Sequence, residues 1–298
     1  MADPTRCLVC GSEALIYHFS AVDSLVSGET FRIMRCGDCG FIFTANPPDK
    51  ERIGTYYLSD DYISHTDRKR NVTEALYHFA RRFMLGRKAK LVTGVCRKKS
   101  GTLLDIGSGT GYFAAFMEEK GWKVKGVEIS DMARNYSVSR FGIDAVPPDA
   151  VRNLADKSVD CITLWHVLEH FYDPDHWMKE IARILKDDGK CIMALPNINS
   201  ADSKRFCNNW AALDVPRHLW HFGPETLNKF VQQRGFRCTM SKGMPLDLFY
   251  ISIISYKNSR TRLAFIRGIA TGTFLAIRNI FIRNSSSSLI YVIEKGHA

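Results

Sequence analysis

The segment "LLDIGSGTGYF" is the first place where residue types and spacing point to chemistry. It starts as an apolar run that predicts a buried strand, and Gly107, Gly109 and Gly111 then alternate with other residues. Such glycines allow a tight turn and let a ligand lie against the backbone at the N-terminus of the next helix. Glu128, at the tip of the next predicted strand, can accept hydrogen bonds from two ribose hydroxyls. The pattern therefore indicates a cofactor of the nucleotide type.

The sixth position of this turn argues against a nicotinamide dinucleotide. The dinucleotide fingerprint G-x-G-x-x-G needs glycine there, so that the helix can pack closely against the strand. In this chain the position holds Tyr112. We therefore expect a cofactor other than NAD.

Two cysteine pairs near the N-terminus have the spacing of a metal site. Each pair reads Cys-x-x-Cys and is followed by glycine, in "CLVCG" and "CGDCG". Two such turns bring four thiolates together, which suits tetrahedral Zn²⁺, and the filled ligand set predicts a structural site. The predicted zinc ligands are Cys7, Cys10, Cys36 and Cys39. The other five of the nine cysteines are scattered through apolar segments, which favours a reduced, cytoplasmic location.

Histidines gather in two segments that follow predicted strands. His166 and His170 lie in "WHVLEH", and His218 lies in "PRHLWHF". In a parallel sheet both segments reach the carboxyl edge, where ligands bind. We predict His166 or His218 as a general base, with His170 as a further catalytic candidate. The alternative, which applies most to His170, is that these histidines cap helices or bond to loop backbone.

Two other side chains of "PRHLWHF" are candidates for substrate binding, Arg217 and His221. The guanidinium of Arg217 can bind a carboxylate or phosphate of the substrate through two parallel hydrogen bonds. It can equally tie its own loop to Asp214. The residue types leave both roles open.

Alternating strand and helix patterns from residue 100 onward must position these side chains. The run "GTLLDIG" predicts a strand, "GYFAAFMEEKG" a helix and "KVKGVEI" a strand. The next run, "SDMARNYSVSRFG", predicts a helix that begins at a serine cap and ends at glycine. The alternation continues through "PDHWMKEIARILKDDG" as a helix and "KCIMALP" as a strand to a last strand, "SSLIYVIEK". It predicts an α/β fold with a mainly parallel sheet and helices on both faces.

The chain divides into three parts. Residues 1–50 hold the cysteine pairs and end at the boundary signal "NPPDK". Residues 51–99 predict a helical linker or cap, with either one amphipathic helix over 71–95 or a pair of helices that divides at Gly86. Residues 100–298 hold the alternating pattern, which a basic, apolar excursion interrupts at 246–284.

Four segments, "LLDIGSGTGYF", "VKGVEIS", "VDCITLWHVLEHFYDP" and "ILKDDGKCIMALPN", resemble in order the motifs of class I S-adenosylmethionine-dependent methyltransferases. The resemblance covers residues 100–245 and implies a Rossmann-like sheet with an antiparallel last strand. It implies that Asp105, Gly107 and Gly109 line the methionine half of S-adenosylmethionine, and that Glu128 holds the ribose. The other cofactor residues that it implies are Ser108 and Gly111 in the turn, Ile129 and Asp149 near adenine, and Leu164 and Trp165 near the sulfonium.

Shorter segments resemble narrower groups of this family. The N-terminal zinc ribbon and "PRHLWHF" are similar to those of bacterial members found with surface-polysaccharide and small-molecule pathways. The segment "HVLEH" is similar to that of quinone O-methyltransferases, in which the pair that resembles Glu169 and His170 is associated with a divalent metal. The resemblance implies methyl transfer to a small molecule, with a hydroxyl of a sugar, sugar-lipid or quinone-like compound as the expected acceptor. Whether oxygen, nitrogen or carbon is methylated stays open.

The net charge of +10 raises further alternatives. One is an RNA methyltransferase whose zinc ribbon and basic segments contact phosphates. Against it, the fourth strand runs into "LWHVLEH" and lacks the Asn/Asp-Pro-Pro-aromatic box used on exocyclic base amines.

The excursion at 246–284, where arginines interleave with apolar residues, has three possible roles. It predicts a peripheral contact with anionic membrane at the inner membrane surface, a lid, or a packed cap helix. A non-catalytic scaffold is a third function, which the intact turn and Glu128 disfavour.

Overall fold

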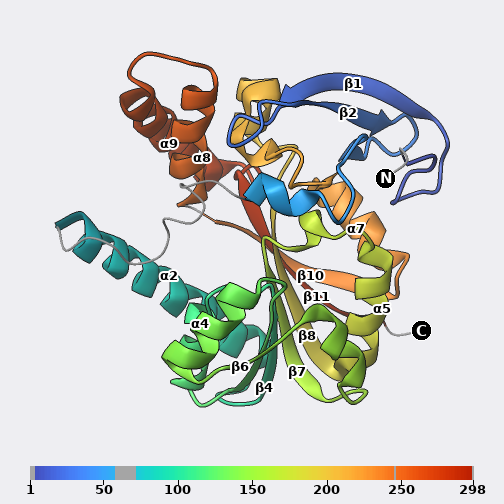
Figure 1. The fold of residues 1–298 in the computed structure, drawn as a ribbon, viewed down its shortest axis with the longest axis vertical. Helices are drawn as coiled ribbons and strands as arrows, with labels where there is room; N and C mark the ends of the chain where they lie inside the picture. The colour runs from blue at the N-terminus through green and yellow to red at the C-terminus, as the bar shows by residue number, and fades with distance from the viewer. Residues whose placement is uncertain (1–3, 58–71, 245, 297–298) are drawn as a thin grey trace.

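The computed structural model describes residues 4–57, 72–244 and 246–296, with the backbone alone described for 72–80. Seven strands of the described chain form one sheet in the order β10-β11-β8-β7-β4-β5-β6 (Figure 1). The strands are β4 (Thr102–Ile106), β5 (Lys123–Val127), β6 (Asp144–Val146), β7 (Val159–Trp165), β8 (Leu185–Pro196), β10 (Phe236–Gly243) and β11 (Ser288–Lys295). β4 to β8 pair in parallel, whereas β11 is antiparallel to both neighbours. The predicted α/β Rossmann-like fold is therefore confirmed.

Helices cover both faces of this sheet because alternate strand residues face opposite ways. In β4, Leu103 packs with α2 (Val72–Cys96) and α3 (Tyr112–Glu118) on one face. Its neighbour Leu104 belongs to the core on the other face, which α5 (Pro174–Ile184) and α7 (Pro224–Gln232) cover. The remaining helix of this region, α4 (Asp131–Phe141), begins at the predicted serine cap and ends at a glycine in the left-handed conformation.

The structure decides one open boundary and corrects another. Of the two forms expected for 71–95, it has the single helix, because the cost of one glycine in a helix, about 1 kcal/mol, is offset by the packing of the apolar side of α2. The helix expected to run to the "KDDG" segment ends at Ile184 instead. Leu185 is fully buried and already pairs with Val159, so β8 starts there. The first residue of the predicted 71–95 helix and the basic run at 68–70 lie outside the described residues.

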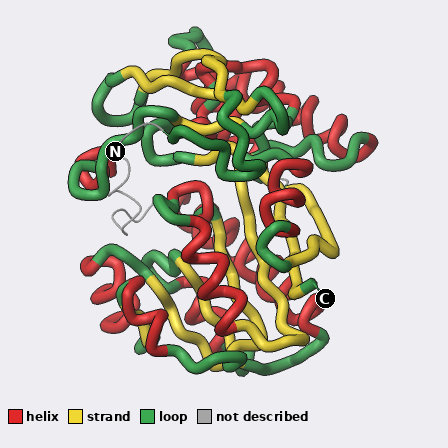
Figure 2. Tube along the Cα trace, turned by 90° about the vertical axis from the view of Figure 1, so that its right-hand side faces the viewer, coloured by secondary structure: helices red, strands yellow, loops and turns green. Residues whose placement is uncertain are grey.

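The N-terminal part forms a second, antiparallel sheet that includes a strand from the far end of the chain. Its order is β1 (Leu15–Val22), β2 (Thr30–Cys36), β3 (Ile42–Thr44) and β9 (Trp220–His221). Residues Ile42 and Phe43 pair with His221 and Trp220, which belong to "PRHLWHF". Figure 2 shows this small sheet above the end of the large one. This N-terminal sheet, called the ribbon below together with its cysteine turns, therefore holds the loop that carries the predicted substrate-binding residues.

The excursion at 246–284 folds into a helical hairpin, α8 (Asp247–Asn258) and α9 (Ala264–Phe281), drawn in red-orange in Figure 1. The two helices approach closely at glycines of α9. A Cβ on Gly268 would lie 2.4 Å from Ile253 Cγ1, and one on Gly272 would lie 2.4 Å from Phe249 Cδ1. Within the described residues, neither helix has the length and apolar content needed to cross a membrane.

Candidate active site

The glycine turn joins β4 to α3 and is held by packing from two sides. The φ angles of Gly107, Gly109 and Gly111 are 73°, 54° and 81°, a region that favours glycine. A Cβ on Gly107 would lie 2.3 Å from Val167 Cγ2, and one on Gly111 would lie 2.1 Å from Ser137 Oγ. A Cβ on Gly109 would meet no described atom within 4 Å. Gly109 is thus the glycine that faces open space, where a ligand can approach the backbone.

Two carboxylates flank this turn, as the motifs predict. Glu128 accepts hydrogen bonds from the backbone N–H of Gly109 and of Ser130, both at 2.9 Å, one on each oxygen. Each oxygen keeps a further lone pair for a hydroxyl donor. Asp105 is buried at the end of β4 and accepts a hydrogen bond of 2.6 Å from Thr163 Oγ1. Burial raises the pKa of Asp105 to about 6, although this bond opposes the shift.

The other predicted cofactor residues follow the same edge of the sheet. In the paired strands Ile106 lies level with Val127 and Leu164, so the ends of β4, β5 and β7 meet. Ile129, just beyond β5, is 81% exposed although apolar. Leu164 is fully buried, and Asp149 is exposed in the segment after β6. Two buried polar atoms, Ser108 Oγ and Trp165 Nε1, have no hydrogen-bond partner among the described residues, which fits a ligand with polar groups at this edge.

His166 stands at the end of β7 between two acidic side chains. Its Nδ1 lies 3.4 Å from Glu169 Oε1, and its Nε2 lies 3.4 Å from Asp247 Oδ2. Burial lowers the pKa of His166, but the two carboxylates outweigh it and raise this pKa to about 9. The imidazole is therefore protonated at neutral pH. This environment disfavours the predicted role of His166 as a base, because a base must start without the proton.

A second cluster joins Glu169 and His170 of "HVLEH" to His218 of "PRHLWHF". One potential ligand atom from each residue lies within 4.8 Å of the others. His170 Nδ1 is 2.9 Å from the carbonyl oxygen of Arg217, and His218 Nδ1 is 2.9 Å from that of Ala212. Since a carbonyl only accepts, each Nδ1 carries a proton, and in the neutral form of each imidazole the lone pair is on Nε2. Both histidines are thus set to accept a proton or bind a metal ion.

The electrostatics of this cluster keep His170 neutral. Burial lowers the pKa of His170 to about 4, and the neighbouring His218 adds to the effect. Glu169 is buried, and its Oε1 lies 3.4 Å from Nδ1 of the protonated His166, at the edge of hydrogen-bonding distance. Burial raises the pKa of Glu169, but the neighbouring histidines together outweigh burial and lower this pKa. The ionised carboxylate is thus paired with His166, and together with His170 and His218 it still offers a donor set that fits a cation.

Arg217 and His221 are held inside the protein. The Arg217 side chain is 1% exposed and donates to Asp214 at 2.7 Å, to Asp23 at 3.0 Å and to the carbonyl of Tyr56 at 2.8 Å. Of the two roles that the sequence leaves open, the structure favours the tie to Asp214. His221 is buried and lies 3.1 Å from Thr44 Oγ1. These contacts hold both side chains against the N-terminal part of the chain, whereas the sequence analysis predicted that they bind the substrate.

The four N-terminal cysteines converge as predicted. Cys7 Sγ lies 3.5 Å from Cys39 Sγ, and Cys10 Sγ lies 3.5 Å from Cys36 Sγ. All four sulfurs fall within 4.8 Å of one another. These separations exceed a disulfide bond of about 2.05 Å and match the edges of a zinc–thiolate tetrahedron with Zn–S bonds of about 2.3 Å. The donor set fits a structural Zn²⁺ ion.

Two site residues are absent from the sequence predictions, Lys88 of α2 and Asp247 of α8. Lys88 Nζ lies 4.3 Å from the centre of the Trp165 ring. Burial lowers the pKa of Lys88, while Asp105 and Asp247 act in the opposite direction. The sequence signal for Lys88 is its place among apolar helix positions, between Leu85 and Val92. Asp247 has no comparable signal, because its contact with His166 is long-range.

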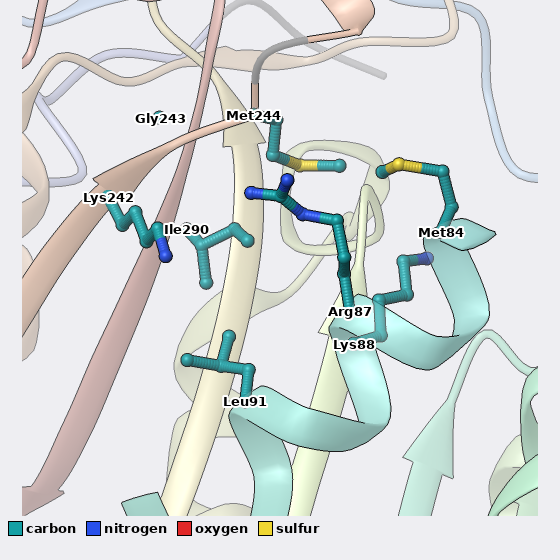
Figure 3. Close-up of a pocket in the computed structure, with 8 residues that line it drawn as sticks. All are labelled: Met84, Arg87, Lys88, Leu91, Lys242, Gly243, Met244 and Ile290. Carbon is teal, nitrogen blue, oxygen red and sulfur yellow. The ribbon is translucent and has the colours of Figure 1, made fainter. Parts of the chain in front are cut away.

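A cavity of about 50 Å³ lies beside Lys88, between α2 and the strands β10 and β11. Figure 3 shows α2 on one side of it and the end of β10 on the other. Its lining residues are Met84, Arg87, Lys88, Leu91, Lys242, Gly243, Met244 and Ile290. The lining combines three cationic side chains with apolar ones, and no carboxylate contributes to it.

Comparisons with known proteins agree with this geometry. Residues 76–240, more than half of the chain, match the model of a family described as "Methyltransferase domain". The chain is 35% identical over 142 residues to the biotin biosynthesis bifunctional protein BioHC of Cellvibrio japonicus, covering 46% of this chain and 28% of that protein. It is 32% identical over 104 residues to the ubiquinone biosynthesis O-methyltransferase of Idiomarina loihiensis, covering 33% of this chain and 43% of that protein. The chain thus matches less than half the length of these curated relatives.

Solved structures share the fold at low identity. One is Haemonchus contortus phosphoethanolamine N-methyltransferase 2 in complex with S-adenosyl-L-methionine, with a TM-score of 0.50 and 17% identity over 71% of this chain and 53% of that one. Another is a chain of the complex between the Haloferax volcanii Trm112 methyltransferase activator and a methyltransferase, with a TM-score of 0.50 and 18% identity over 74% and 94% of the two chains. The chain described here therefore belongs to the methyltransferase domain family, and its Rossmann-like domain is that of an S-adenosylmethionine-dependent methyltransferase, as its motifs predict.

Proposed function

We propose that this protein transfers the methyl group of S-adenosylmethionine to a small molecule, at a hydroxyl of a sugar, sugar-lipid or quinone-like acceptor. The observation that supports this most is the meeting of two features at one sheet edge. The glycine turn braced by Glu128 is one, and the cluster of Glu169, His170 and His218 from "HVLEH" and "PRHLWHF" is the other. They are in contact, since Val167 of "HVLEH" packs directly on Gly107.

The residues of the turn would hold the cofactor. Glu128 would accept hydrogen bonds from the ribose hydroxyls, and the exposed Ile129 would cover the adenine. Asp105, Ser108 and Gly109 would face the methionine half. The sulfonium supplies an activated methyl group, so the protein mainly has to align the acceptor for an in-line displacement.

We propose His218 as the general base for a hydroxyl acceptor. Its Nδ1–H is committed to the carbonyl of Ala212, which leaves Nε2 to take the proton. Asp214 Oδ2 lies 3.8 Å from Nε2 and would stabilise the imidazolium that forms. His166, protonated between two carboxylates, would instead supply positive charge beside the acceptor.

Glu169, His170 and His218 also fit a divalent metal ion, which would bind and orient the acceptor oxygen. This use and the base role of His218 exclude each other. Dialysis against a chelator followed by metal analysis and turnover distinguishes them. Unchanged turnover without the divalent metal supports the base, and loss of turnover that Mg²⁺ or Mn²⁺ restores supports the metal. Zinc held by the four cysteines would be measured in the same sample, at one ion per chain.

The cavity beside Lys88 suits only an anionic group of the acceptor and the atoms next to it, because its volume of about 50 Å³ has room for no more. Arg87, Lys88 and Lys242 supply the positive charge, and two methionines supply adaptable apolar surface. Arg217, which was predicted for such an anion, is already paired. We therefore propose the cavity, rather than "PRHLWHF", as the place that binds the anion.

The test is incubation with methyl-labelled S-adenosylmethionine and fractionated host extract, with Glu128→Ala as the inactive control. Label that resists RNase and partitions with sugars or lipids supports the proposal. Label that RNase removes would favour the RNA alternative, for which none of the matched relatives gives support. Turnover by the control at the wild-type rate would contradict the proposed cofactor site. A cytoplasmic location stays a prediction.

A further inference from the structure

The outer face of the α8–α9 hairpin is apolar and exposed, with no other described segment over it. Of the twenty-one large apolar side chains that are exposed in the described chain, eleven lie within 246–282. Those on α9 are Phe265, Ile266, Ile269, Phe274, Ile277, Ile280 and Phe281, with exposed fractions of 39% to 79%. At about 100° per residue they occupy one half of the helix circumference. On the other half, Gly268, Gly272 and Leu275 are buried, and the two glycines lie against α8.

Apart from Asp247 at the start of α8, which lies against His166, the charged residues of this hairpin are all basic. Between Asp247 and Glu294 the sequence contains no acidic residue. The basic residues of this stretch are Lys257, Arg260, Arg262, Arg267, Arg278 and Arg283. Arg267 and Arg278 are eleven residues apart, which is three helical turns, so they follow one line along the border of the apolar face. An apolar face bordered by arginines is typical of a helix that lies in the interface of an anionic membrane.

The packing of the hairpin leaves that face free. α8 packs on α6 (Ala201–Phe206) and on the short helices η4 (Cys207–Asn209) and η5 (Ala211–Leu213), and α9 packs on α8. Figure 1 shows the hairpin projecting beside the N-terminal sheet. Within the described residues, α9 has no large contact with the seven-stranded sheet, so the prediction of a cap packed there does not describe it.

We propose that the outer face of the α8–α9 hairpin docks this protein on the surface of an anionic lipid bilayer, with α9 lying in the interface plane. Exposed phenylalanine and isoleucine side chains enter the acyl boundary, and the arginines contact lipid phosphates. RNA offers phosphates but no apolar layer for these side chains. A second copy of the chain would bring a like-charged arginine border against this one. The bilayer is the partner that matches both properties. The proposal does not depend on the acceptor or on methyl transfer.

Flotation of the full-length protein with lipid vesicles tests this proposal. The vesicles are phosphatidylcholine alone, or phosphatidylcholine with roughly a third phosphatidylglycerol, which sets the surface potential. We expect the wild type to float with the anionic vesicles and to remain at the bottom with the neutral ones. Arg262→Glu/Arg267→Glu/Arg283→Glu should lower the partition coefficient by about 100-fold, because each arginine contributes at the anionic surface. Phe274→Ser/Ile277→Ser should lower it by about tenfold, because the apolar contacts are lost.

A matched variant separates local from total charge. Arg82→Glu/Lys90→Glu/Lys99→Glu makes the same change in net charge at exposed positions in and just after α2, away from the hairpin sequence. It should float like the wild type, and circular dichroism and thermal unfolding confirm that each variant is folded. Failure of the wild type to float with anionic vesicles would overturn the proposal. So would equal loss of flotation in both charge variants. A lipid-free dimer that Phe274→Ser/Ile277→Ser dissociates, with no flotation, would instead identify the face as a contact between two copies.

Discussion

The two halves of the carboxyl edge are held in different ways. In the half proposed to bind the cofactor (the cofactor half), Glu128 bonds to Gly109 and Ser130, all within one strand–turn–helix unit and the next strand. In the half proposed to bind the acceptor (the acceptor half), the contacts join distant parts of the chain, Thr44 to His221 and Asp23 to Arg217. The first half depends on a local motif. The second depends on how the ribbon and the hairpin pack, so it can change between proteins that share the same cofactor turn.

The largest expected effect is on turnover, and it comes from a change in the acceptor half alone. His218→Ala should lower kcat by about 100- to 10,000-fold if His218 is the general base, and the Kd for S-adenosylmethionine should not change. Turnover is measured with the acceptor recovered from extract, and binding by calorimetry. His176→Ala, at an exposed histidine of α5, is the control and should behave as wild type. Wild-type turnover by His218→Ala would remove it as the base.

The next effect is on stability and tests the long-range ties. Arg217→Met should lower the free energy of unfolding by about 3–5 kcal/mol, because it leaves the buried Asp23 without its cation. Urea unfolding measures this change. Arg52→Met removes an exposed pair with Glu29 and should cost about 1 kcal/mol or less. Similar losses in the two variants would mean that Arg217 does not hold the ribbon to its loop.

A third change tests whether the cofactor half depends on its local geometry. Gly107→Ala should weaken binding of S-adenosylmethionine by about 100-fold, because the new methyl group meets Val167 and the backbone has a positive φ. Gly142→Ala has the same kind of φ, 72°, but open space around its Cβ. It should leave the Kd unchanged. Equal affinities in Gly107→Ala and the wild type would contradict the proposed binding turn.

The smallest effect concerns His166, where the two halves meet. Its pKa is raised to about 9 from about 6.5, so the stability it contributes is present below pH 6.5 and is lost as pH rises through 9. Because a third of the side chain is exposed, we expect about 1–2 kcal/mol. Urea unfolding of wild type and His166→Gln between pH 6 and 10 measures it. A difference between the two that does not vary with pH would contradict the ion pairs.

The sequence predicted which residues meet around the glycine turn, because strand, turn and next strand are contiguous there. Asp105, the three glycines and Glu128 lie together at one edge, as expected from the parallel register and the family resemblance, and their role in binding the cofactor stays a proposal. The same logic located "HVLEH" and "PRHLWHF" at that edge. It did not predict which histidine is protonated, because the state of His166 depends on Asp247, eighty-one positions along the chain. The role of Arg217 likewise depends on Asp23 of the ribbon.

Calorimetric titration of S-adenosylmethionine into the wild type and into Glu128→Ala and His218→Ala tests the central claim most directly. The account predicts one binding site per chain in the wild type, a strong loss of affinity in Glu128→Ala and unchanged affinity in His218→Ala. That pattern would separate the cofactor half from the acceptor half. Absence of binding by the wild type, or equal affinity in Glu128→Ala, would contradict the assignment of the glycine turn as the cofactor site.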